Sequence, residues 1–250
     1  MFGHPTLEVI NPHVTHVNLI YIKIRYLAIS LCVCILGIGL WLDAGQFSTA
    51  VIAPEQLQIV LDAGHGGFDN GACVDGVSEA ALNLQIVKVL ATELRNHGCA
   101  VSFTRVDSES LNSPYASNKK VDDMAKRRDK IRSLHPDLVI SIHQNTFPLT
   151  SVSGLQCFYA NETAGSKDYA TAIQNQFNQS GLPFAKKPKP TDFNLVEHSP
   201  CPAVLIECGF LTNPRERKLL QDPAYQQILA YHIATAVIQE SSRQHAVTNA

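Results

Sequence analysis

Three short apolar runs along the chain each lead into side chains that bind metals or move protons. Valine, isoleucine and leucine dominate these runs, which are residues 59–62, 137–142 and 203–206. His65 follows the first run, His143 comes directly after the second, and Glu207 comes directly after the third. Such runs are typical of strands buried on both faces of a parallel sheet, where ligands gather at the carboxyl ends of the strands. The pattern therefore predicts two imidazoles and a carboxylate at one edge of a sheet.

Between these strands the apolar positions recur at helical spacing. In the predicted helix 79–97, leucine and isoleucine side chains fall on one face, and Gly98 follows where a left-handed cap favours glycine. Further strands are expected at 100–104 and 155–159, and further helices at 121–134, 168–179 and 223–240. Residues 107–120 are expected to form a long loop, and 186–190 a connector. This alternation predicts an α/β fold: a single three-layer domain with a mostly parallel, twisted sheet and helices on both faces.

The first part of the chain has a different pattern. Residues 27–42 carry no charge, and with Tyr26 the run reaches seventeen residues, the lower limit for a membrane-spanning helix. Lys23 and Arg25 precede the run and Asp43 follows it, which places the amino end in the cytoplasm and the remainder outside.

Two interpretations of this run remain open. One is an uncleaved signal anchor, and the other is a signal peptide removed after a small-residue site such as 48–50. Either one predicts a protein on the periplasmic or cell-wall side, membrane-anchored or secreted. The expected organisation is a cytoplasmic segment, the transmembrane or signal segment, a linker, the folded domain and a tail, at residues 1–26, 27–42, 43–55, 56–243 and 244–250.

Composition narrows the possible partners. The chain has 20 basic and 22 acidic residues with no basic stripe, so nucleic acid is not an expected partner. Two of the seven cysteines lie in the apolar segment, which leaves an odd five, and no Cys-x-x-Cys pair occurs. A zinc knuckle or thioredoxin-like motif is therefore excluded, and free thiols are expected, with a Cys201–Cys208 disulfide as the alternative.

Each polar residue at the sheet edge has an ordinary structural explanation when it is considered alone. His65 could be incidental to a tight glycine turn, and Glu79 could oppose the dipole of its helix. His143 could be a hydrogen-bonded core histidine. Glu207 is the most informative, because carboxylates are rarely buried without a partner and burial raises their pKa toward that of a general base.

Considered together, these residues predict a catalytic zinc site. Catalytic zinc takes three ligands from histidine and carboxylate side chains and keeps one position for water. His65, Glu79 and His143 supply such a set, and Glu207 would then stand beside it as the group that moves protons. Bound zinc lowers the pKa of water toward about 7, which makes hydroxide available at neutral pH.

The chain resembles the zinc-dependent N-acetylmuramoyl-L-alanine amidases of the type-3 amidase family. The resemblance extends from about Leu57 to Glu240 and rests on motifs that occur in family order. They are 61–67, Glu79 with Asn83-Leu84, Thr104-Arg105, Arg127, 141–145 and 202–213.

This resemblance implies one Zn²⁺ held by His65, Glu79 and His143, with Glu207 as the catalytic acid and base. The implied reaction is hydrolysis of the amide between N-acetylmuramic acid and the L-alanine of the stem peptide in peptidoglycan. Arg105 and Asn145 are further candidates, as substrate contacts or as residues that orient the ligands. A protein activator of unknown identity is a possible partner.

Some relatives carry an extra helix, after the strand that matches 155–159, which plugs the zinc site until a partner removes it. Here only residues 160–167 separate that strand from the next helix, so we expect no such plug.

Two other functions remain open on the sequence. A catalytically inactive, membrane-anchored peptidoglycan-binding protein would keep the fold and lose a ligand or Glu207. A zinc peptidase would instead cut within the stem peptide, although the His-Glu-x-x-His helix of one large peptidase class is absent from the sequence.

Overall fold

The protein is described by a computed structural model covering residues 25, 27, 31, 56–179 and 186–248. All but a few residues of the predicted segments 1–26, 27–42 and 43–55 lie outside this described part. Within the described part, no helix has both the length and the apolar character required to cross a bilayer. Every element named below belongs to one compact unit, Glu55–Ala250.

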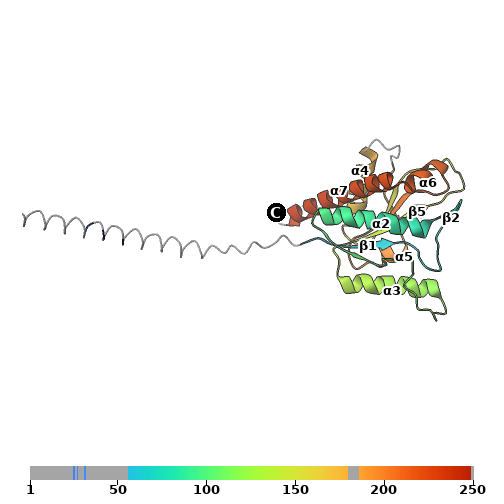
Figure 1. Ribbon diagram of the computed structural model, residues 1–250, viewed down its shortest axis with the longest axis horizontal. Helices are drawn as coiled ribbons and strands as arrows, with labels where there is room; N and C mark the ends of the chain where they lie inside the picture. Colours follow the sequence, from blue (N-terminus) through green and yellow to red (C-terminus); the bar gives the residue numbers. More distant parts are fainter. Residues whose placement is uncertain (1–24, 26, 28–30, 32–55, 180–185, 249–250) are drawn as a thin grey trace, which may run out of the picture. The chain divides into compact units, whose positions relative to one another are not determined.

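A six-stranded sheet forms the middle of this unit (Figure 1). Its strands, in spatial order, are β4 (Ala100–Phe103), β1 (Gln58–Ala63), β5 (Leu138–Asn145), β8 (Ala203–Phe210), β6 (Gln156–Ala160) and β7 (Lys189–Thr191). The first four strands are parallel to one another, whereas β6 pairs antiparallel with β8 and β7 runs parallel to β6. The expected mostly parallel sheet is confirmed, with two strands at one edge running in the opposite direction.

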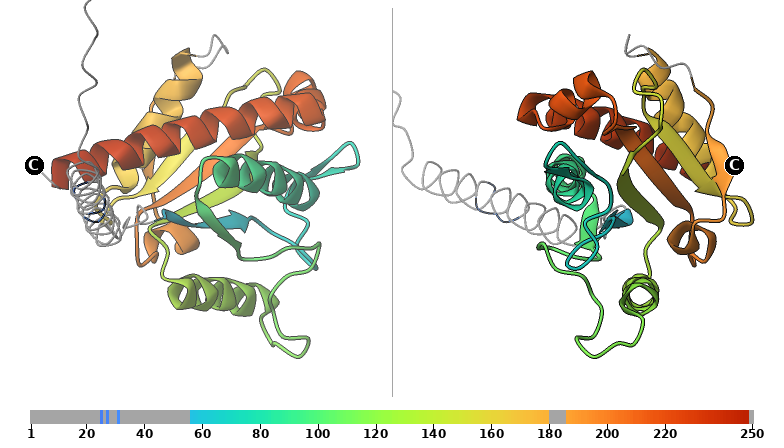
Figure 2. Two further views of the ribbon diagram at one scale, coloured as in Figure 1. Left: turned by 60° about the vertical axis from the view of Figure 1, so that its left-hand side comes forward. Right: turned by 90° about the vertical axis from the view of Figure 1, so that its right-hand side faces the viewer.

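Helices cover both faces of the sheet, as Figures 1 and 2 show. They are α2 (Glu79–Asn96), α3 (Lys119–Leu134), α4 (Ser166–Gln179), α5 (Asn194–Glu197), α6 (Pro214–Leu220) and α7 (Pro223–Thr248). Because side chains alternate along a strand, Ile59 and Leu61 of β1 join the core under α2, α4 and α7, whereas Val60 joins the smaller core under α3 and α5. The three-layer architecture predicted from the alternating pattern is therefore confirmed.

The register of three central strands sets the position of the site. Ala63 pairs with Ile142, Ile142 pairs with Ile206, and His143 pairs with Glu207. Neighbouring residues at the same level of a sheet project to the same face. The second histidine and the last carboxylate of the predicted site are therefore side by side on adjacent strands.

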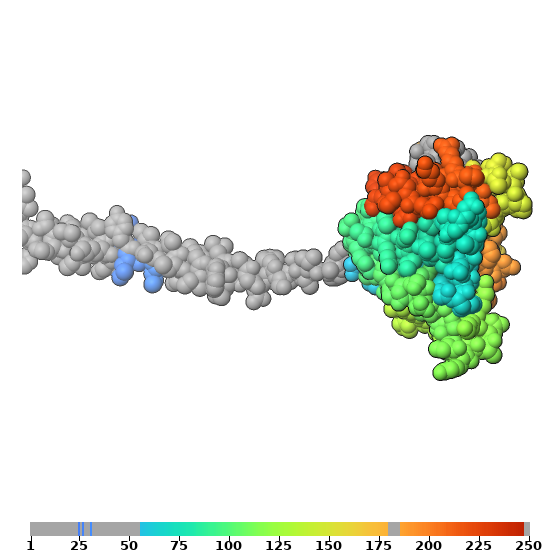
Figure 3. All heavy atoms as spheres, turned by 45° about the vertical axis from the view of Figure 1, so that its right-hand side comes forward, coloured from blue at the N-terminus to red at the C-terminus, as the bar shows by residue number. Residues whose placement is uncertain are grey.

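Several local elements differ from the expectations. The segment expected as a connector supplies β7, where Pro190 is tolerated because the strand lies at the sheet edge. Strand β8 continues to Phe210, beyond Glu207. Helix α7 extends to Thr248, into the expected tail, because neither glycine nor proline follows position 240 to stop it. Helix α3 begins at Lys119, within the expected loop, and the rest of that loop projects beside it (Figure 3).

A small hairpin and a short helix were not predicted. Strands β2 (Cys73–Val74) and β3 (Val77–Ser78) are joined by Asp75 and Gly76, both with positive φ. An Asp-Gly pair favours a two-residue hairpin turn, because both residues tolerate positive φ. Helix α5 is only four residues long, too short for helical periodicity to reveal.

The five cysteines in the described part are free thiols. Cys99, Cys157 and Cys208 are buried, and burial raises the pKa of each of these thiols. The structure thus contains no Cys201–Cys208 disulfide and agrees with the free-thiol expectation.

Candidate metal and catalytic site

The loop after β1 is shaped so that two ligands can approach each other closely. His65 itself has a φ of 62°, in the left-handed region that few residues other than glycine adopt. A Cβ at Gly64 would lie 2.2 Å from the His143 ring, and a Cβ at Gly71 would lie 2.5 Å from Glu79 Oε2. Glycine is required at both positions because any larger residue would fill the space that the ligands occupy.

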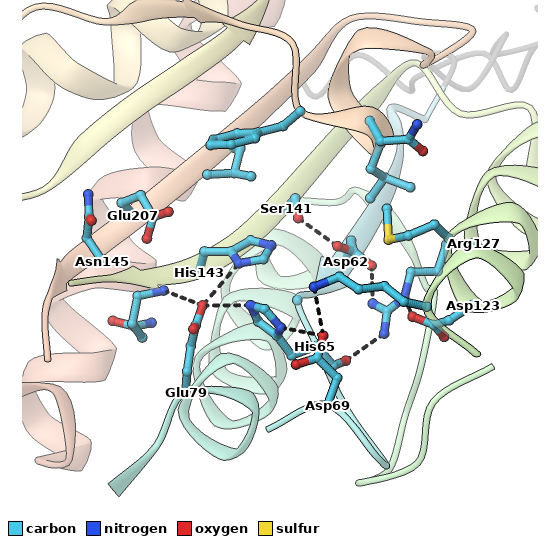
Figure 4. A pocket seen from close by; sticks show the side chains of 18 of the residues that line it. Asp62, His65, Asp69, Glu79, Asp123, Arg127, Ser141, His143, Asn145 and Glu207 are labelled. Atoms are coloured by element: carbon cyan, nitrogen blue, oxygen red, sulfur yellow. Dashed lines mark hydrogen bonds and ion pairs between the residues drawn. The ribbon is translucent and has the colours of Figure 1, made fainter. Parts of the chain in front are cut away.

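His65, Glu79 and His143 converge at the carboxyl edge of the sheet (Figure 4). One possible ligand atom from each residue lies within 4.8 Å of the others. Glu79 Oε1 is 3.2 Å from His65 Nε2 and 3.1 Å from His143 Nδ1, and the two rings meet edge to face at 5.0 Å. The three residues come from the β1 loop, the first turn of α2 and β5, so only the fold brings them together.

Two of the three candidate ligands, His65 and Glu79, are fixed by further contacts. His65 Nδ1 is 2.9 Å from Asp69 Oδ2, and a carboxylate can only accept, so Nδ1 carries the proton and Nε2 faces the site. The two oxygens of Glu79 accept from the backbone N–H groups of Gln144 and Ala72 at 3.1 and 2.8 Å. Such partners orient metal ligands and set the tautomer of an imidazole.

The charges within the cluster depend strongly on each other. Burial alone would raise the pKa of Glu79, but His143 and His65 hold that pKa well below its usual range. Burial alone would lower the pKa of His65, but hydrogen bonds and charge from Glu79 and Asp69 raise it. A divalent cation bound here would supply positive charge beside Glu79, and metal binding releases protons from its ligands.

Glu207 lies beside the three ligands and is the least satisfied carboxylate of the group. Its Oε2 is buried without a hydrogen-bond partner among the described residues. Burial raises the pKa of Glu207 to about 7, with His143 opposing this rise and Glu79 adding to it. A desolvated carboxylate with a pKa near neutrality is suited to accept and return a proton.

The donor set fits a zinc ion. Two imidazole nitrogens and one carboxylate oxygen match the ligands of catalytic zinc, and imidazole favours zinc over calcium or magnesium. Glu207 lines the cavity beside the cluster, and its Oε2 has no protein donor among the described residues. The four residues predicted from the sequence are thus all present at one site.

Arg105 and Asn145 occupy different positions. The guanidinium of Arg105 is buried and donates to backbone carbonyls of Ala63, Gly64, Ala80 and Asp107. These contacts favour the positioning role over substrate contact, because they hold the β1 loop against the start of α2. Asn145 lies at the end of β5 beside Glu207 and lines the cavity (Figure 4).

An ion pair beneath the site was not predicted as a functional feature. Asp62 and Arg127 are almost fully buried, and Arg127 Nη1 donates to Asp62 Oδ1 at 2.7 Å. Arg127 also donates to the carbonyl of His65 and pairs with Asp123. The signal in the sequence was a charged residue, Asp62, at the end of an apolar run, where an unpaired carboxylate would be costly.

A cavity of about 420 Å³ opens over the ligands. It lies on the α3 and α5 side of the sheet, where Leu205 and Glu207, two residues apart on β8, face the same way. The cavity continues from the ligands to side chains of α3 and α5, including Met124 and Leu195. This volume is typical of a ligand-binding site.

Two imidazoles and a carboxylate, beside an unpaired carboxylate at the carboxyl edge of an α/β sheet, are typical of a metal-dependent hydrolase. Comparison with known proteins supports this class. The family model for N-acetylmuramoyl-L-alanine amidase matches residues 59–239. The chain therefore belongs to the N-acetylmuramoyl-L-alanine amidase family, which makes it a hydrolase of peptidoglycan.

Individual relatives agree with this assignment. The germination-specific N-acetylmuramoyl-L-alanine amidase of Bacillus subtilis (strain 168) is 32% identical over 184 residues, 72% of this chain and 78% of that protein. The CwlD amidase from Clostridioides difficile, solved in complex with the GerS lipoprotein, has a TM-score of 0.72 and 33% identity, covering 75% of this chain and 99% of that one. An N-acetylmuramoyl-L-alanine amidase from Clostridium difficile 630 has a TM-score of 0.67 and 29% identity. The match covers 75% of this chain and 97% of that one.

The buried ion pair predicts how stability changes in acid. Burial opposes ionisation of Asp62, but Arg127 and the hydroxyls of Ser141 and Thr104 hold its pKa at about 2, below the ordinary value of 3.8 for an aspartate. A depressed pKa stabilises the folded state above the unfolded-state pKa, and this contribution is lost as the pH falls from 3.8 through about 2. The lowered pKa of Asp62 contributes about 2 kcal/mol to the free energy of unfolding at neutral pH.

We therefore expect Asp62→Asn to lower the free energy of unfolding by about 3 kcal/mol at neutral pH, because Arg127 loses a buried partner. The difference between wild type and variant should shrink by about 2 kcal/mol between about pH 5 and pH 2. Urea unfolding followed by circular dichroism at several pH values measures this difference. A difference that does not change with pH would contradict the ion-pair assignment.

Proposed function

We propose that this amidase acts through one Zn²⁺ bound by His65, Glu79 and His143, with Glu207 as the catalytic acid and base. The substrate bond is the amide between the lactyl group of N-acetylmuramic acid and L-alanine. The observation that carries the proposal is the convergence of these three ligands beside a buried carboxylate oxygen that has no partner in the described part of the chain.

The residues of the chain divide the work. A zinc ion bound at this site supplies Lewis acidity, which polarises the substrate carbonyl and lowers the pKa of water. Glu207 accepts the proton of the attacking water on its free oxygen and then delivers it to the nitrogen of L-alanine as the amide breaks. Asp69 and the backbone N–H groups around Glu79 hold the ligands in place during these steps.

The alternatives make different predictions for this site. A catalytically inactive wall-binding protein needs neither the ligand triad nor an unpaired Glu207, whereas all four side chains are in place here. A zinc peptidase would release products that differ in mass from those of an amidase. Only the amidase frees peptides that begin with L-alanine, so mass spectrometry of digested peptidoglycan separates the two.

The proposed place of action is outside the cytoplasm, where peptidoglycan lies. The uncharged run 27–42 supports tethering to the membrane or export through a signal peptide.

Removing the proton-moving group should stop turnover without removing the metal. We expect Glu207→Gln to lower kcat at least about 100-fold, because general acid–base catalysis contributes on this scale, while zinc stays near one per chain. His65→Ala should lose both zinc and activity. The two measurements are zinc content by elemental analysis and release of peptides that begin with L-alanine. Glu162→Gln is the matched control, because Glu162 is an exposed carboxylate. Normal turnover by Glu207→Gln would remove Glu207 from its role.

The absence of a plug helix is also testable. Between β6 and α4 the structure has only residues 161–165, with no helix in this link. We therefore expect the purified protein with zinc to digest peptidoglycan without any added partner, as measured by release of soluble muropeptides. Complete dependence on an added activator would show that access to the site is controlled in another way.

A further inference from the structure

The cavity extends beyond the metal ligands into a groove between α3 and α5. Its wall on this side is apolar and includes Met124, Leu195 and Leu205, with the partly exposed ring of Phe193 at the rim. The reaction itself uses none of these side chains. A groove that leads away from the cleaved bond is the place where the rest of a substrate would lie.

Lys120 stands at the mouth of this groove, in the first turn of α3. Apart from the two histidines of the candidate metal site, the basic residues among the described residues that line the cavity are Lys120 and Arg127. Arg127 is buried and committed to Asp62 and Asp123. The side chain of Lys120 is 68% exposed, so its ammonium is accessible to a ligand.

The ammonium of Lys120 also lies close to the candidate metal site. Lys120 Nζ lies 3.4 Å from Asp69 Oδ2, and the same oxygen lies 2.9 Å from His65 Nδ1. Lys120 is therefore separated from a proposed metal ligand by a single carboxylate. An ammonium group has three donors, and the contact with Asp69 uses one of them.

The chemistry of the substrate decides what such a cation can recognise. On the sugar side the lactyl carboxyl is consumed in the amide bond, so no charge remains there. On the peptide side, carboxylates follow within two residues of the cleaved bond, a distance of about 7 Å in an extended chain. An accessible cation this near the metal site therefore matches the peptide side and not the glycan side.

We propose that Lys120 binds a carboxylate of the stem peptide next to the cleaved amide, which places the peptide side of the substrate along the groove between α3 and α5. The inference rests on the proposed amidase function and adds the orientation of the substrate. Lys120 acts as a specificity-determining residue, and an exposed ion pair of this kind changes kcat/KM by up to about fivefold.

The test compares two small substrates with the full chain loaded with zinc. One is N-acetylmuramoyl-L-alanyl-D-glutamate, and the other is its diamide, in which both side-chain and terminal carboxyls are neutral. We expect the wild type to cleave the dicarboxylate with a kcat/KM about three- to fivefold higher than the diamide. Lys120→Gln should reduce this ratio to about one, and Lys120→Glu should reverse it, because a like charge repels the carboxylate.

Lys119→Gln is the matched control, because it removes the same charge from the neighbouring residue of α3, which does not line the cavity. It should keep the wild-type ratio. The wild-type preference should also decrease as the sodium chloride concentration rises, since salt screens exposed charges.

The outcomes separate this inference from the function on which it rests. Failure of the wild type to cleave either substrate would overturn the amidase proposal, and the inference with it. Cleavage of both substrates with equal kcat/KM would overturn the inference alone. An equal loss on both substrates in Lys120→Gln would also overturn it, because Lys120 would then act only through Asp69 and His65.

Discussion

The buried ion pair between Asp62 and Arg127 is the constraint on which the site depends. Asp62 accepts from Ser141 on β5, from Thr104 after β4 and from Arg127 on α3, so one carboxylate joins three neighbouring elements to β1. Arg127 donates in turn to the carbonyls of Ala63 and His65. Through these hydrogen bonds, Arg127 on α3 holds the loop that carries His65. Because the pair is desolvated, loss of Arg127 would leave Asp62 as an uncompensated buried charge, and loss of Asp62 would leave Arg127 with Asp123 as its remaining ion-pair partner.

Above this pair the structure gathers three carboxylates, of which the surrounding protein leaves Glu207 alone poorly compensated. Glu79 and Glu207 face the two imidazoles, and Asp69 supports one of them. The ionised form of Glu207 is unfavourable for folding, because burial and the charge of Glu79 both oppose its ionisation. The proposed function accounts for this cost, since a divalent cation at the site would relieve the repulsion and Glu207 would have to remain unpaired to accept a proton. The surrounding hydrogen bonds from backbone N–H groups hold this arrangement in place.

The two faces of the sheet differ: one carries the larger core, and the other carries a smaller core and the cavity. The larger core under α2, α4 and α7 is continuous and apolar, and it supports the strand register that aligns His143 with Glu207. The opposite face carries only a small core under α3 and α5, and the cavity opens there. Because few apolar side chains cover this face, it leaves space for the groove in which we propose that the substrate lies. Family membership indicates the reaction, whereas the proposed role of Lys120 concerns the groove on this second face.

The sequence by itself determined the layer architecture and the four residues of the site, because buried parallel strands leave continuous apolar runs and their polar ends must meet at one edge. It also supplied the family motifs. Tertiary structure alone decided which atoms of these residues face each other, that Asp69 orients His65, and that Arg105 is committed to backbone carbonyls. It also decided the reversed edge strands, and it placed Lys120 beside Asp69. These features depend on strand pairing and side-chain direction across residues far apart in the chain, which local periodicity does not encode.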